Sequence, residues 1–363
     1  MAAAKHPASA VLRDRKRSHL DLCETEQVEY RGKTTLFEDV ELIHNSLPEL
    51  ALDDIDLSVE FLGKRLRAPF LITGMTGGTD EAFAVNRDLA SVAERCGIAF
   101  GLGSQRVMQR DPQTAWTFAV REFAPSTLLL ANIGLIQAGE QSTAELQRLV
   151  ESVGADGLCV HLNPAQELIQ PEGDRNFRGG STTLARLCHE LGVPVIAKET
   201  GCGISRAVGE ALRNAGVRYA DVSGAGGTSW VRVEALRGNA QSRRLGELFS
   251  TWGIPTAASL AMLRGSGLEL IASGGLRTGL EMAKAIALGA RLCGAALPIY
   301  RAYRDAGIDG ALALVEELIA GLKTAMLLTG SRTLADLAHQ PLVLGEHINS
   351  WIAAGQTRAA NNE

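Results

Sequence analysis

Several features that decide where a protein works are missing from this sequence. It has no uninterrupted apolar run of the roughly 18 residues that a transmembrane helix needs. Residues 1–12 lack the continuous apolar core of a secretory signal, and the six cysteines show no CxxC spacing. We therefore expect a protein of a reducing, cytoplasmic compartment that does not enter a membrane.

The sequence also lacks an excess of basic charge. The formal net charge is −5 and the pI is about 5.9. The sequence therefore has no excess of positive charge of the kind that binds nucleic acid. The one dense basic run, Arg13–Arg17, is typical of a solvated N-terminal arm. We therefore expect no nucleic-acid partner.

What the sequence does contain is an ordinary globular composition with many glycines. The 363 residues are 46% hydrophobic and 21% charged, which suits one large α/β domain or two smaller ones. The 39 glycines cluster in short runs rather than in a linker. Short glycine runs let the backbone approach a ligand closely, so they indicate binding loops.

Short apolar runs recur along the chain with helical stretches between them. The runs expected to form strands are Pro69–Thr73, Ile98–Gly101, Thr127–Asn132, Gly157–Leu162, Val193–Lys198, Tyr219–Ser223, Leu268–Ser273 and Leu292–Leu297. The amphipathic stretches between them are Ala82–Cys96, Thr143–Val153, Thr182–Leu191, Ile204–Ala215, Pro255–Leu263 and Gly279–Leu288. Apolar strands alternating with helices are typical of a parallel sheet buried on both faces. Eight such units predict an α/β fold, a (β/α)8 TIM barrel, rather than a doubly wound open sheet.

The spacing predicts a single barrel domain with additions at both ends. Residues 1–67 are expected to form an N-terminal capping arm, residues 68–354 the barrel, and residues 355–363 a polar tail. The segment 224–264 is longer than its counterparts and contains the polar stretch Arg237–Arg244. We interpret it as an extended loop after a strand, of the kind that often serves as a lid.

Glycine turns follow the last two predicted strands. In a (β/α)8 barrel the loops after these strands commonly form a phosphate site, and here they contain Gly274–Gly275 and Gly294. Arg277 follows one of them, and Ser223 and Thr228 add hydroxyl groups beside another glycine run. Backbone N–H groups in such turns hold anions. The sequence therefore predicts a phosphate site at this end of the barrel.

A lysine, Lys198, ends the fifth predicted strand. A buried lysine needs an anionic or electron-rich partner. A reduced flavin ring would be such a partner if the phosphate belongs to a flavin cofactor, and a salt bridge with Glu199 or Asp221 is the alternative. The amide of Asn132 and the hydroxyl of Ser104 are suited to the same ring.

The fourth predicted strand ends in a polar cluster within HLNPAQE. Cys159, His161 and Asn163 share one face by the strand period of two, so His161 and Asn163 are expected at the barrel mouth. Glu167 is an oxygen ligand suited to Mg²⁺. Gln166 has no useful pKa, so His161, a metal or a cofactor must supply acid–base power.

The basic stretch near the N-terminus has a second interpretation, as part of this site. Arg15, Lys16 and His19 precede the barrel and could fold over its mouth to clamp a diphosphate. Arg106, after a strand end, could reach the same anion.

Taken together, these residues resemble those of a known family, the type 2 isopentenyl-diphosphate isomerases. The matching motifs are MTGG at Met75–Gly78, GLGSQR at Gly101–Arg106, HLNPxQExxQPEGDRxF at His161–Phe177, KETGCGIS at Lys198–Ser205, SGAGGTSW at Ser223–Trp230, SGGLRTG at Ser273–Gly279 and RKxxH at Arg15–His19. The resemblance implies an FMN-binding barrel that interconverts isopentenyl and dimethylallyl diphosphate in isoprenoid biosynthesis. It also implies a need for reduced flavin, NADPH or NADH, and Mg²⁺, and assembly as a homo-tetramer or homo-octamer.

The resemblance further implies roles for individual residues. The implied FMN contacts are Gly74, Met75, Thr76, Ser104, Asn132, Lys198, Ser223, Thr228, Gly275, Leu276, Arg277, Ala296 and Leu297. The implied substrate contacts are Arg15, Lys16, His19, Ser104, Gln105, Arg106, Asn163 and Gln166. Glu167 would bind Mg²⁺, and Gln166 and His161 would position proton transfer at a reduced flavin.

Three other functions compete with this interpretation. A flavin-free barrel like IMP dehydrogenase needs a nucleophilic cysteine after the sixth strand, where this chain has GAGGTSW. A 2-hydroxy-acid-oxidising FMN barrel would carry a catalytic histidine after the seventh strand, where this chain has Ser273 followed by two glycines. A flavin redox sensor would not need the metal-ready polar cluster at His161–Glu167.

Overall fold

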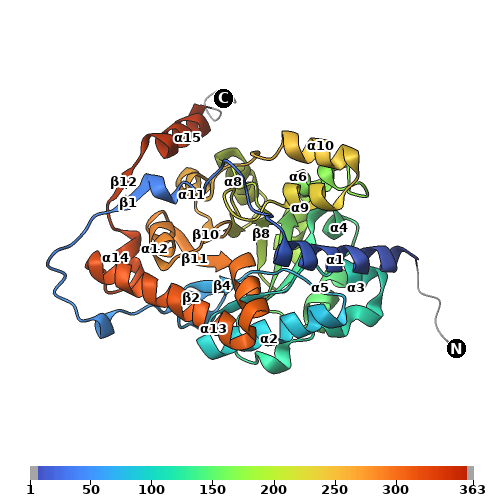
Figure 1. The fold of residues 1–363 in the computed structure, drawn as a ribbon, viewed down its shortest axis with the longest axis horizontal. Helices are drawn as coiled ribbons and strands as arrows, with labels where there is room; N and C mark the ends of the chain where they lie inside the picture. Colours follow the sequence, from blue (N-terminus) through green and yellow to red (C-terminus); the bar gives the residue numbers. More distant parts are fainter. Residues whose placement is uncertain (1–6, 358–363) are drawn as a thin grey trace.

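The computed structural model describes residues 7–357, with the side chains of residues 16–356. Eight parallel strands close into a barrel in the order β10-β11-β4-β5-β6-β7-β8-β9, as predicted (Figure 1). They are β4 (Phe70–Ile72), β5 (Ala99–Gly101), β6 (Leu129–Gly134), β7 (Gly157–Leu162), β8 (Val195–Glu199), β9 (Tyr219–Asp221), β10 (Glu269–Ala272) and β11 (Ala290–Ala295). The last strand ends two residues before its predicted end because Leu297 already begins a helix.

The inside of the barrel is a packed core that is plugged at one end. Alternate strand residues such as Leu130, Cys159 and Ile196 fill it. The hairpin of β2 (Val59–Phe61) and β3 (Lys64–Leu66) joins the same cluster. The hairpin lies where β7 begins, so it closes the end of the barrel opposite the strand ends.

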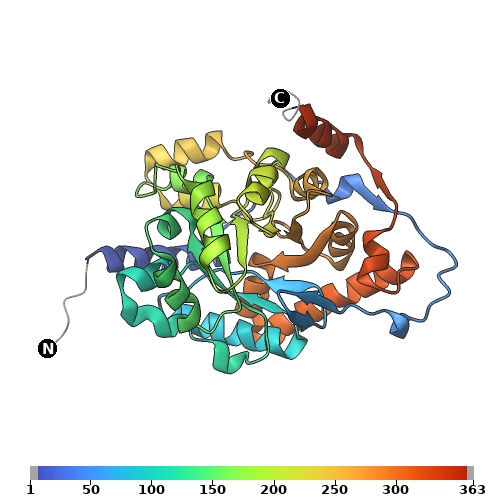
Figure 2. The same ribbon diagram turned by 180° about the vertical axis from the view of Figure 1, so that it is seen from behind.

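Helices surround the barrel on its outer face (Figures 1 and 2). The predicted stretches form α2 (Asp80–Cys96), α5 (Thr143–Ser152), α7 (Gly180–Glu190), α8 (Arg206–Asn214), α11 (Thr256–Leu263) and α12 (Gly279–Ala287), each within two residues of the predicted bounds. Their starts follow from local sequence, since Thr79, Ser142 and Thr278 each accept a hydrogen bond from a backbone N–H of the first turn.

Shorter helices and the long final barrel helix complete the ring. They are α3 (Arg106–Arg110), η3 (Pro112–Phe118), η4 (Arg121–Phe123), α4 (Leu135–Gly139), α6 (Pro164–Ile169) and α13 (Leu297–Leu328). Helix α13 is kinked at Ala306 and Gly307, whose backbone angles are not helical. Among the described residues, no helix is both long and apolar enough to cross a membrane.

The prediction of an extended loop over residues 224–264 is wrong for residues 230–248. The segment forms two packed helices, α9 (Trp230–Arg237) and α10 (Ala240–Leu248). Asn239 sits between them and accepts hydrogen bonds from the N–H groups of Gln241 and Ser242, which starts the second helix. Of the polar residues that indicated a loop, Asn239, Gln241, Arg243 and Arg244 are exposed, whereas Ser242 is buried.

The N-terminal and C-terminal segments meet outside the barrel. Helix α1 (Pro7–Thr25) contacts α3, α9 and α13, and so lies against the barrel mouth (Figure 1). Beyond η1 (Phe37–Asp39), β1 (Val40–Leu42) pairs antiparallel with β12 (Leu342–Leu344). The remaining elements are η2 (Leu52–Asp54), α14 (Leu334–Ala338) and α15 (Glu346–Thr357). Helix α15 extends past residue 355, where the polar tail was expected to begin.

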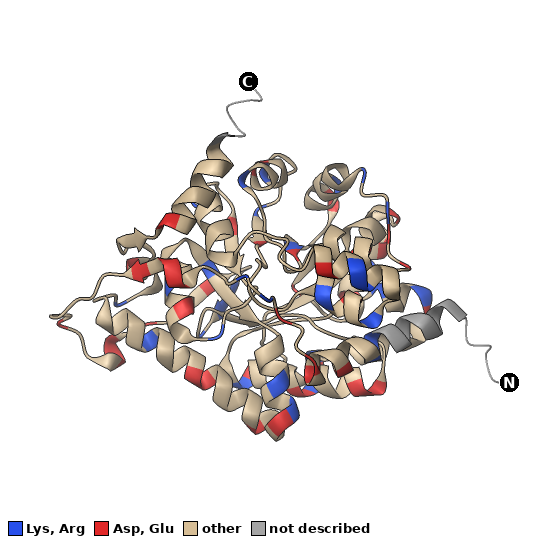
Figure 3. Ribbon diagram, turned by 45° about the horizontal axis from the view of Figure 1, so that its top comes forward, with Lys and Arg blue, Asp and Glu red and all other residues tan. Residues whose placement is uncertain are grey.

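Acidic and basic side chains are interspersed over the described part of the molecule (Figure 3). Many of them pair, as Arg304 does with Glu24 and Arg121 with Asp156. The mixed pattern agrees with the mild net charge of −5.

Candidate active site

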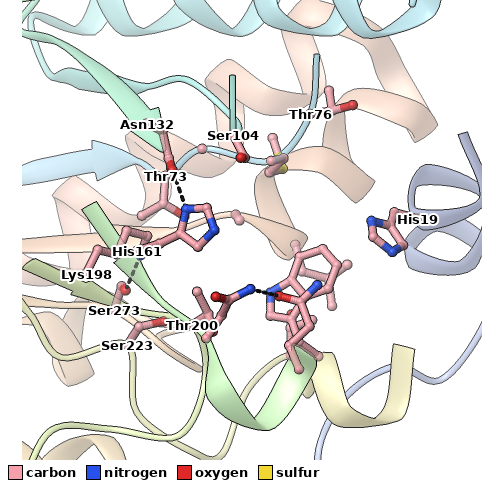
Figure 4. A pocket seen from close by; sticks show the side chains of 18 of the residues that line it. His19, Thr73, Thr76, Ser104, Asn132, His161, Lys198, Thr200, Ser223 and Ser273 are labelled. Carbon is pink, nitrogen blue, oxygen red and sulfur yellow. Dashed lines mark hydrogen bonds between the residues drawn. The ribbon is translucent and has the colours of Figure 1, made fainter. Parts of the chain in front are cut away.

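A cavity lies where the barrel strands end, between the loops after the strands and helix α1 (Figure 4). Most of the predicted site residues line it: Lys16, His19, Gly74, Met75, Thr76, Ser104, Arg106, Asn132, His161, Asn163, Gln166, Glu167, Lys198, Ser223, Thr228, Gly275, Arg277, Ala296 and Leu297. They come from distant parts of the sequence, and the closed barrel brings them together. Their roles in binding and catalysis remain predictions.

Two predicted residues have side chains that point away from the cavity. The side chain of Gln105 is fully buried behind the cavity wall, where it accepts a hydrogen bond from the Asn132 N–H at 3.0 Å. Leu276 packs into the hydrophobic core. Neither side chain faces a ligand in the cavity, because Gln105 is hydrogen-bonded within the cavity wall and Leu276 is packed in the core. The side chain of a third predicted residue, Arg15, lies outside the described residues.

His161 is oriented by the neighbouring strand. Its Nδ1 lies 2.8 Å from the side-chain oxygen of Asn132, on β6 beside β7 (Figure 4). Because an amide oxygen accepts, Nδ1 is the donor in this contact. Two residues earlier, Cys159 points into the barrel core, so the strand period places His161 at the mouth as predicted.

Glu167 is a buried carboxylate surrounded by donors. It lies in the first turn of α6, and its oxygens accept hydrogen bonds from Asn163 Nδ2 at 3.1 Å and from the N–H of Asp174 at 2.7 Å. Arg106 is 3.8 Å from Glu167 and 3.5 Å from Asp174. Among the described residues there is no group of three acidic, histidine or cysteine side chains that could hold a metal. A cation at Glu167 would therefore depend on oxygens from a ligand.

Glu234 is a functional candidate that the sequence did not reveal. This fully buried carboxylate, on α9, accepts hydrogen bonds from His19 at 3.0 Å and from Gln166 Nε2 at 3.0 Å, and from Arg237 Nε at 2.9 Å. Burial opposes its ionisation, but the hydrogen bond and charge of His19 and the charge of Arg237 outweigh it and lower the pKa of Glu234 to about 2. It thus stays ionised at neutral pH.

Lys198 forms a salt bridge with Asp221, which was one of its two predicted salt-bridge partners, and it also lines the cavity. Its Nζ lies 2.6 Å from the fully buried carboxylate of Asp221 on β9. The other oxygen of Asp221 accepts a hydrogen bond from Ser273 Oγ at 2.6 Å. Such pairing offsets the cost of burying both charges and holds the ammonium group at the cavity floor (Figure 4).

The predicted glycine turns pack closely against each other. Gly274 and Gly275 have φ of +95° and +91°, which side-chain-bearing residues rarely adopt. A Cβ on Gly227 would lie 2.4 Å from the N atom of Gly275, so these two loops touch through their backbones. Beside them, Arg277 forms an ion pair with Glu29 of the N-terminal segment.

Several buried polar atoms at the cavity have no partner within the described part of the chain. Among the described side chains, Thr76 Oγ1, Arg106 Nε and Tyr300 Oη are buried without a hydrogen bond, and all three residues line the cavity. Unpaired buried polar groups are rare in native proteins. They fit a polar ligand with several oxygen and nitrogen acceptors, such as FMN. Tyr300 was not predicted from the sequence.

The fold resembles that of flavin enzymes of the FMN-dependent class. Residues 181–344 match the family model of the FMN-dependent dehydrogenases. A solved structure of mandelate oxidase with (S)-2-phenylpropionate superposes with a TM-score of 0.63 at 18% identity, over 94% of this chain and 99% of that chain. A mandelate oxidase variant with a monooxide FMN adduct gives a TM-score of 0.61 at 18% identity, over 92% and 100%. At this identity the likeness concerns the fold.

Curated relatives define the family more narrowly. An isopentenyl-diphosphate delta-isomerase of Nostoc sp. is 48% identical over 336 residues, covering 91% of this chain and 95% of the relative. Those of Methanothermobacter thermautotrophicus and Rickettsia rickettsii are 44% and 46% identical, covering 94% and 90% of this chain and 96% of each relative. The chain therefore belongs to the isopentenyl-diphosphate delta-isomerase family, in its FMN-dependent type.

Proposed function

We propose that this protein interconverts isopentenyl diphosphate and dimethylallyl diphosphate in isoprenoid biosynthesis, using reduced FMN and Mg²⁺. The observation that carries the proposal is the arrangement of Gln166, Glu167 and His161 at the barrel mouth, in one cavity with the glycine turns at Gly275 and Gly294. A carboxylate that could share a cation with a ligand, in one cavity with glycine turns suited to a phosphate, suits a cofactor and a diphosphate bound side by side.

The residues of the cavity fit FMN. The glycine turns and Arg277 would hold its phosphate through backbone N–H groups and a guanidinium charge. Asn132 and Lys198 would contact its ring system, and Lys198 favours negative charge there. When bound in its reduced form, FMN supplies the acid–base capacity and the electron-rich surface that an alkene isomerisation through a cationic intermediate needs.

The diphosphate would bind beneath α1. Lys16 and His19 face the cavity from this helix, and Arg106 reaches it from α3. The 3.8 Å and 3.5 Å contacts of Arg106 with two carboxylates are long, so the guanidinium can turn to a stronger anion. Glu167 would then share a Mg²⁺ ion with the diphosphate, which supplies the remaining oxygen ligands.

Gln166 and His161 would hold the alkene in place for proton transfer. The Gln166 amide is fixed at both ends, because it donates to Glu234 and accepts from Asn163 at 3.2 Å. An amide does not titrate in the range of enzyme chemistry, so Gln166 orients rather than exchanges protons. His161, held by Asn132, presents Nε2 as a nearby proton acceptor or donor.

Deuterium exchange tests the proposed reaction directly. The protein with FMN, NADPH, Mg²⁺ and isopentenyl diphosphate in heavy water should form dimethylallyl diphosphate and place deuterium in both isomers, as followed by mass spectrometry. The matched control is the same mixture without reductant, in which exchange should be lost. Absence of exchange under reducing conditions would reject the isomerase.

The proposal also covers the electron donor to the flavin, the oligomeric state of the protein and its cellular compartment. NADPH or NADH would reduce the flavin, and the protein would act in the cytoplasm as a homo-tetramer or homo-octamer. Exposed apolar side chains such as Leu248, Phe249 and Trp252 offer surface for contacts between copies. Light scattering of the purified protein would decide the assembly, and a monomer would contradict it.

A further inference from the structure

Tyr300 carries a buried hydroxyl group for which the described protein supplies no partner. The side chain is 1% exposed, and its Oη makes no hydrogen bond with any described residue. An unpaired buried hydroxyl has lost its hydrogen bonds to water without replacement, which destabilises a protein and is therefore rare. A ligand that binds beside Tyr300 would remove this penalty.

The tyrosine lies where α13 begins, at the end of the cavity that is expected to bind an anion. It is in the first turn of α13, three residues after Leu297, and lines the cavity together with Leu297 and Gly294. The start of a helix presents unpaired backbone N–H groups and the positive end of the helix dipole, which favour a phosphate. The Tyr300 side chain thus lines the cavity beside this helix start, where Arg304, Glu24 and Glu81 are the charged groups that act on its hydroxyl.

Neighbouring polar side chains of α13 already have protein partners. Tyr303 Oη donates to Asp88 at 2.8 Å, away from the cavity. Arg304 pairs with Glu24 at 2.9 Å and with Glu81 at 3.4 Å. Burial raises the pKa of Tyr300 above its ordinary value, so its hydroxyl keeps the proton that it can donate.

We propose that Tyr300 is an FMN-binding residue, which donates a hydrogen bond from Oη to an oxygen of the ribityl phosphate chain. The inference rests on the proposed function only for the binding of FMN in this cavity, and it is independent of the reaction catalysed. The diphosphate of the substrate offers similar oxygen acceptors. The test must therefore separate binding of the cofactor from binding of the substrate.

The substitution Tyr300→Phe removes only the hydroxyl group. FMN titrated into the full-length apoprotein should bind the variant about tenfold more weakly than the wild type, as followed by quenching of flavin fluorescence. The ligand-free variant should melt at the same or a higher temperature, because it loses a polar atom that had no partner. A residue that matters only for folding would not show this combination.

Tyr303→Phe is the matched control on the same helix. It removes a hydroxyl that bonds to Asp88 outside the cavity. We expect this control to lower the melting temperature and to leave FMN affinity unchanged, the opposite pattern to Tyr300→Phe. If Tyr300→Phe does not fold, Tyr300→Met, which also fills the space with apolar atoms, serves the same comparison.

Equal FMN affinity of the Tyr300 variant and the wild type would overturn the inference and leave a bound water as the partner of the hydroxyl. A higher KM for isopentenyl diphosphate at saturating FMN, with FMN affinity unchanged, would also overturn it, since the hydroxyl would then serve the substrate. Failure of the wild type to bind FMN would instead reject the proposed function.

Discussion

At the scale of single residues, Glu234 connects parts of the site that are far apart in the sequence. Its carboxylate joins His19 on the N-terminal helix to Gln166 after the fourth barrel strand, and Arg237 balances its charge. A fully buried carboxylate is stable only with such partners. We infer that Glu234 is a positioning residue that holds two cavity-lining side chains at a fixed separation.

Glu234→Gln should impair both stability and substrate binding. The change leaves Arg237 without its buried anionic partner, and we expect the free energy of unfolding to fall by about 3 kcal/mol. His19 loses its carboxylate partner, so the KM for isopentenyl diphosphate should rise about tenfold. Urea unfolding and steady-state kinetics measure the two effects.

The control for this substitution is Glu172→Gln. Glu172 also pairs with Arg237, but its side chain is 36% exposed, so its loss should cost less than about 1 kcal/mol. Unchanged KM in Glu234→Gln would mean that the carboxylate supports the fold alone.

Glu199 should make stability depend on pH near neutrality. Burial raises the pKa of this carboxyl to about 7, although the backbone N–H groups of residues 200–203 donate to it. Between pH 4.5, its ordinary pKa, and pH 7 the unfolded chain releases the proton while the folded protein keeps it. Its contribution to stability is therefore fully present below pH 4.5 and is lost as pH rises through 7.

The substitution Glu199→Gln tests this pH dependence, because the amide cannot titrate. Urea titrations at pH 5 and at pH 8 measure the free energy of unfolding of both proteins. As the pH rises, the wild type should lose free energy of unfolding relative to the variant. A difference that stays constant over this range would show that Glu199 has an ordinary pKa in the fold.

At the scale of elements, the helical pair α9–α10 carries part of the site. Trp230 and Glu234 lie on α9, and Trp230 packs edge-on against His19 with ring centres 5.1 Å apart. The start of α10 depends on the side chain of Asn239. The pair is thus a packed helical element from which Trp230 reaches the cavity, and not an extended loop.

Asn239→Ala should weaken this pair by removal of the helix cap. We expect a loss of about 1 kcal/mol in the free energy of unfolding, measured by urea denaturation. Asn239→Ser, which keeps a side-chain oxygen at the same position, should retain most of the stability. Equal losses in the two variants would show that the cap is unimportant.

At the scale of the whole molecule, the site exists only in the closed fold. The barrel gathers the strand ends, and α1 covers them by contact with α3, α9 and α13. A ligand that binds only this arrangement must stabilise the fold as a whole. Pairing of β1 with β12 links the two terminal regions to the same unit.

FMN is therefore expected to stabilise the entire protein. At a concentration of about 100 times its Kd, FMN should add about 2.7 kcal/mol to the free energy of unfolding, as measured by chemical denaturation. Riboflavin, which lacks the phosphate, should stabilise much less at the same concentration. Equal stabilisation by both would show that the glycine turns do not bind a phosphate.

Much of the barrel could be predicted because its signals are local. Apolar runs bounded by polar residues marked each strand, and amphipathic stretches such as Thr143–Val153 marked helices between them. The period of two placed His161 at the mouth, above Cys159 in the core. The helical pair at residues 230–248 was missed because a stretch rich in polar and charged residues is typical of a loop. Only the folded structure shows that these residues cover an apolar face.

The sequence by itself determined the order of the barrel strands, most of the helices between them, the polar residues at the strand ends and the family to which the chain belongs. Only the tertiary structure decided that Glu234 joins His19 and Gln166, that Gln105 turns into the wall, and that Tyr300 faces the cavity with no partner among the described residues. The physical reason is that periodicity and capping act between near neighbours in the chain. Pairing of buried polar groups depends on which distant segments the closed barrel brings within hydrogen-bonding distance.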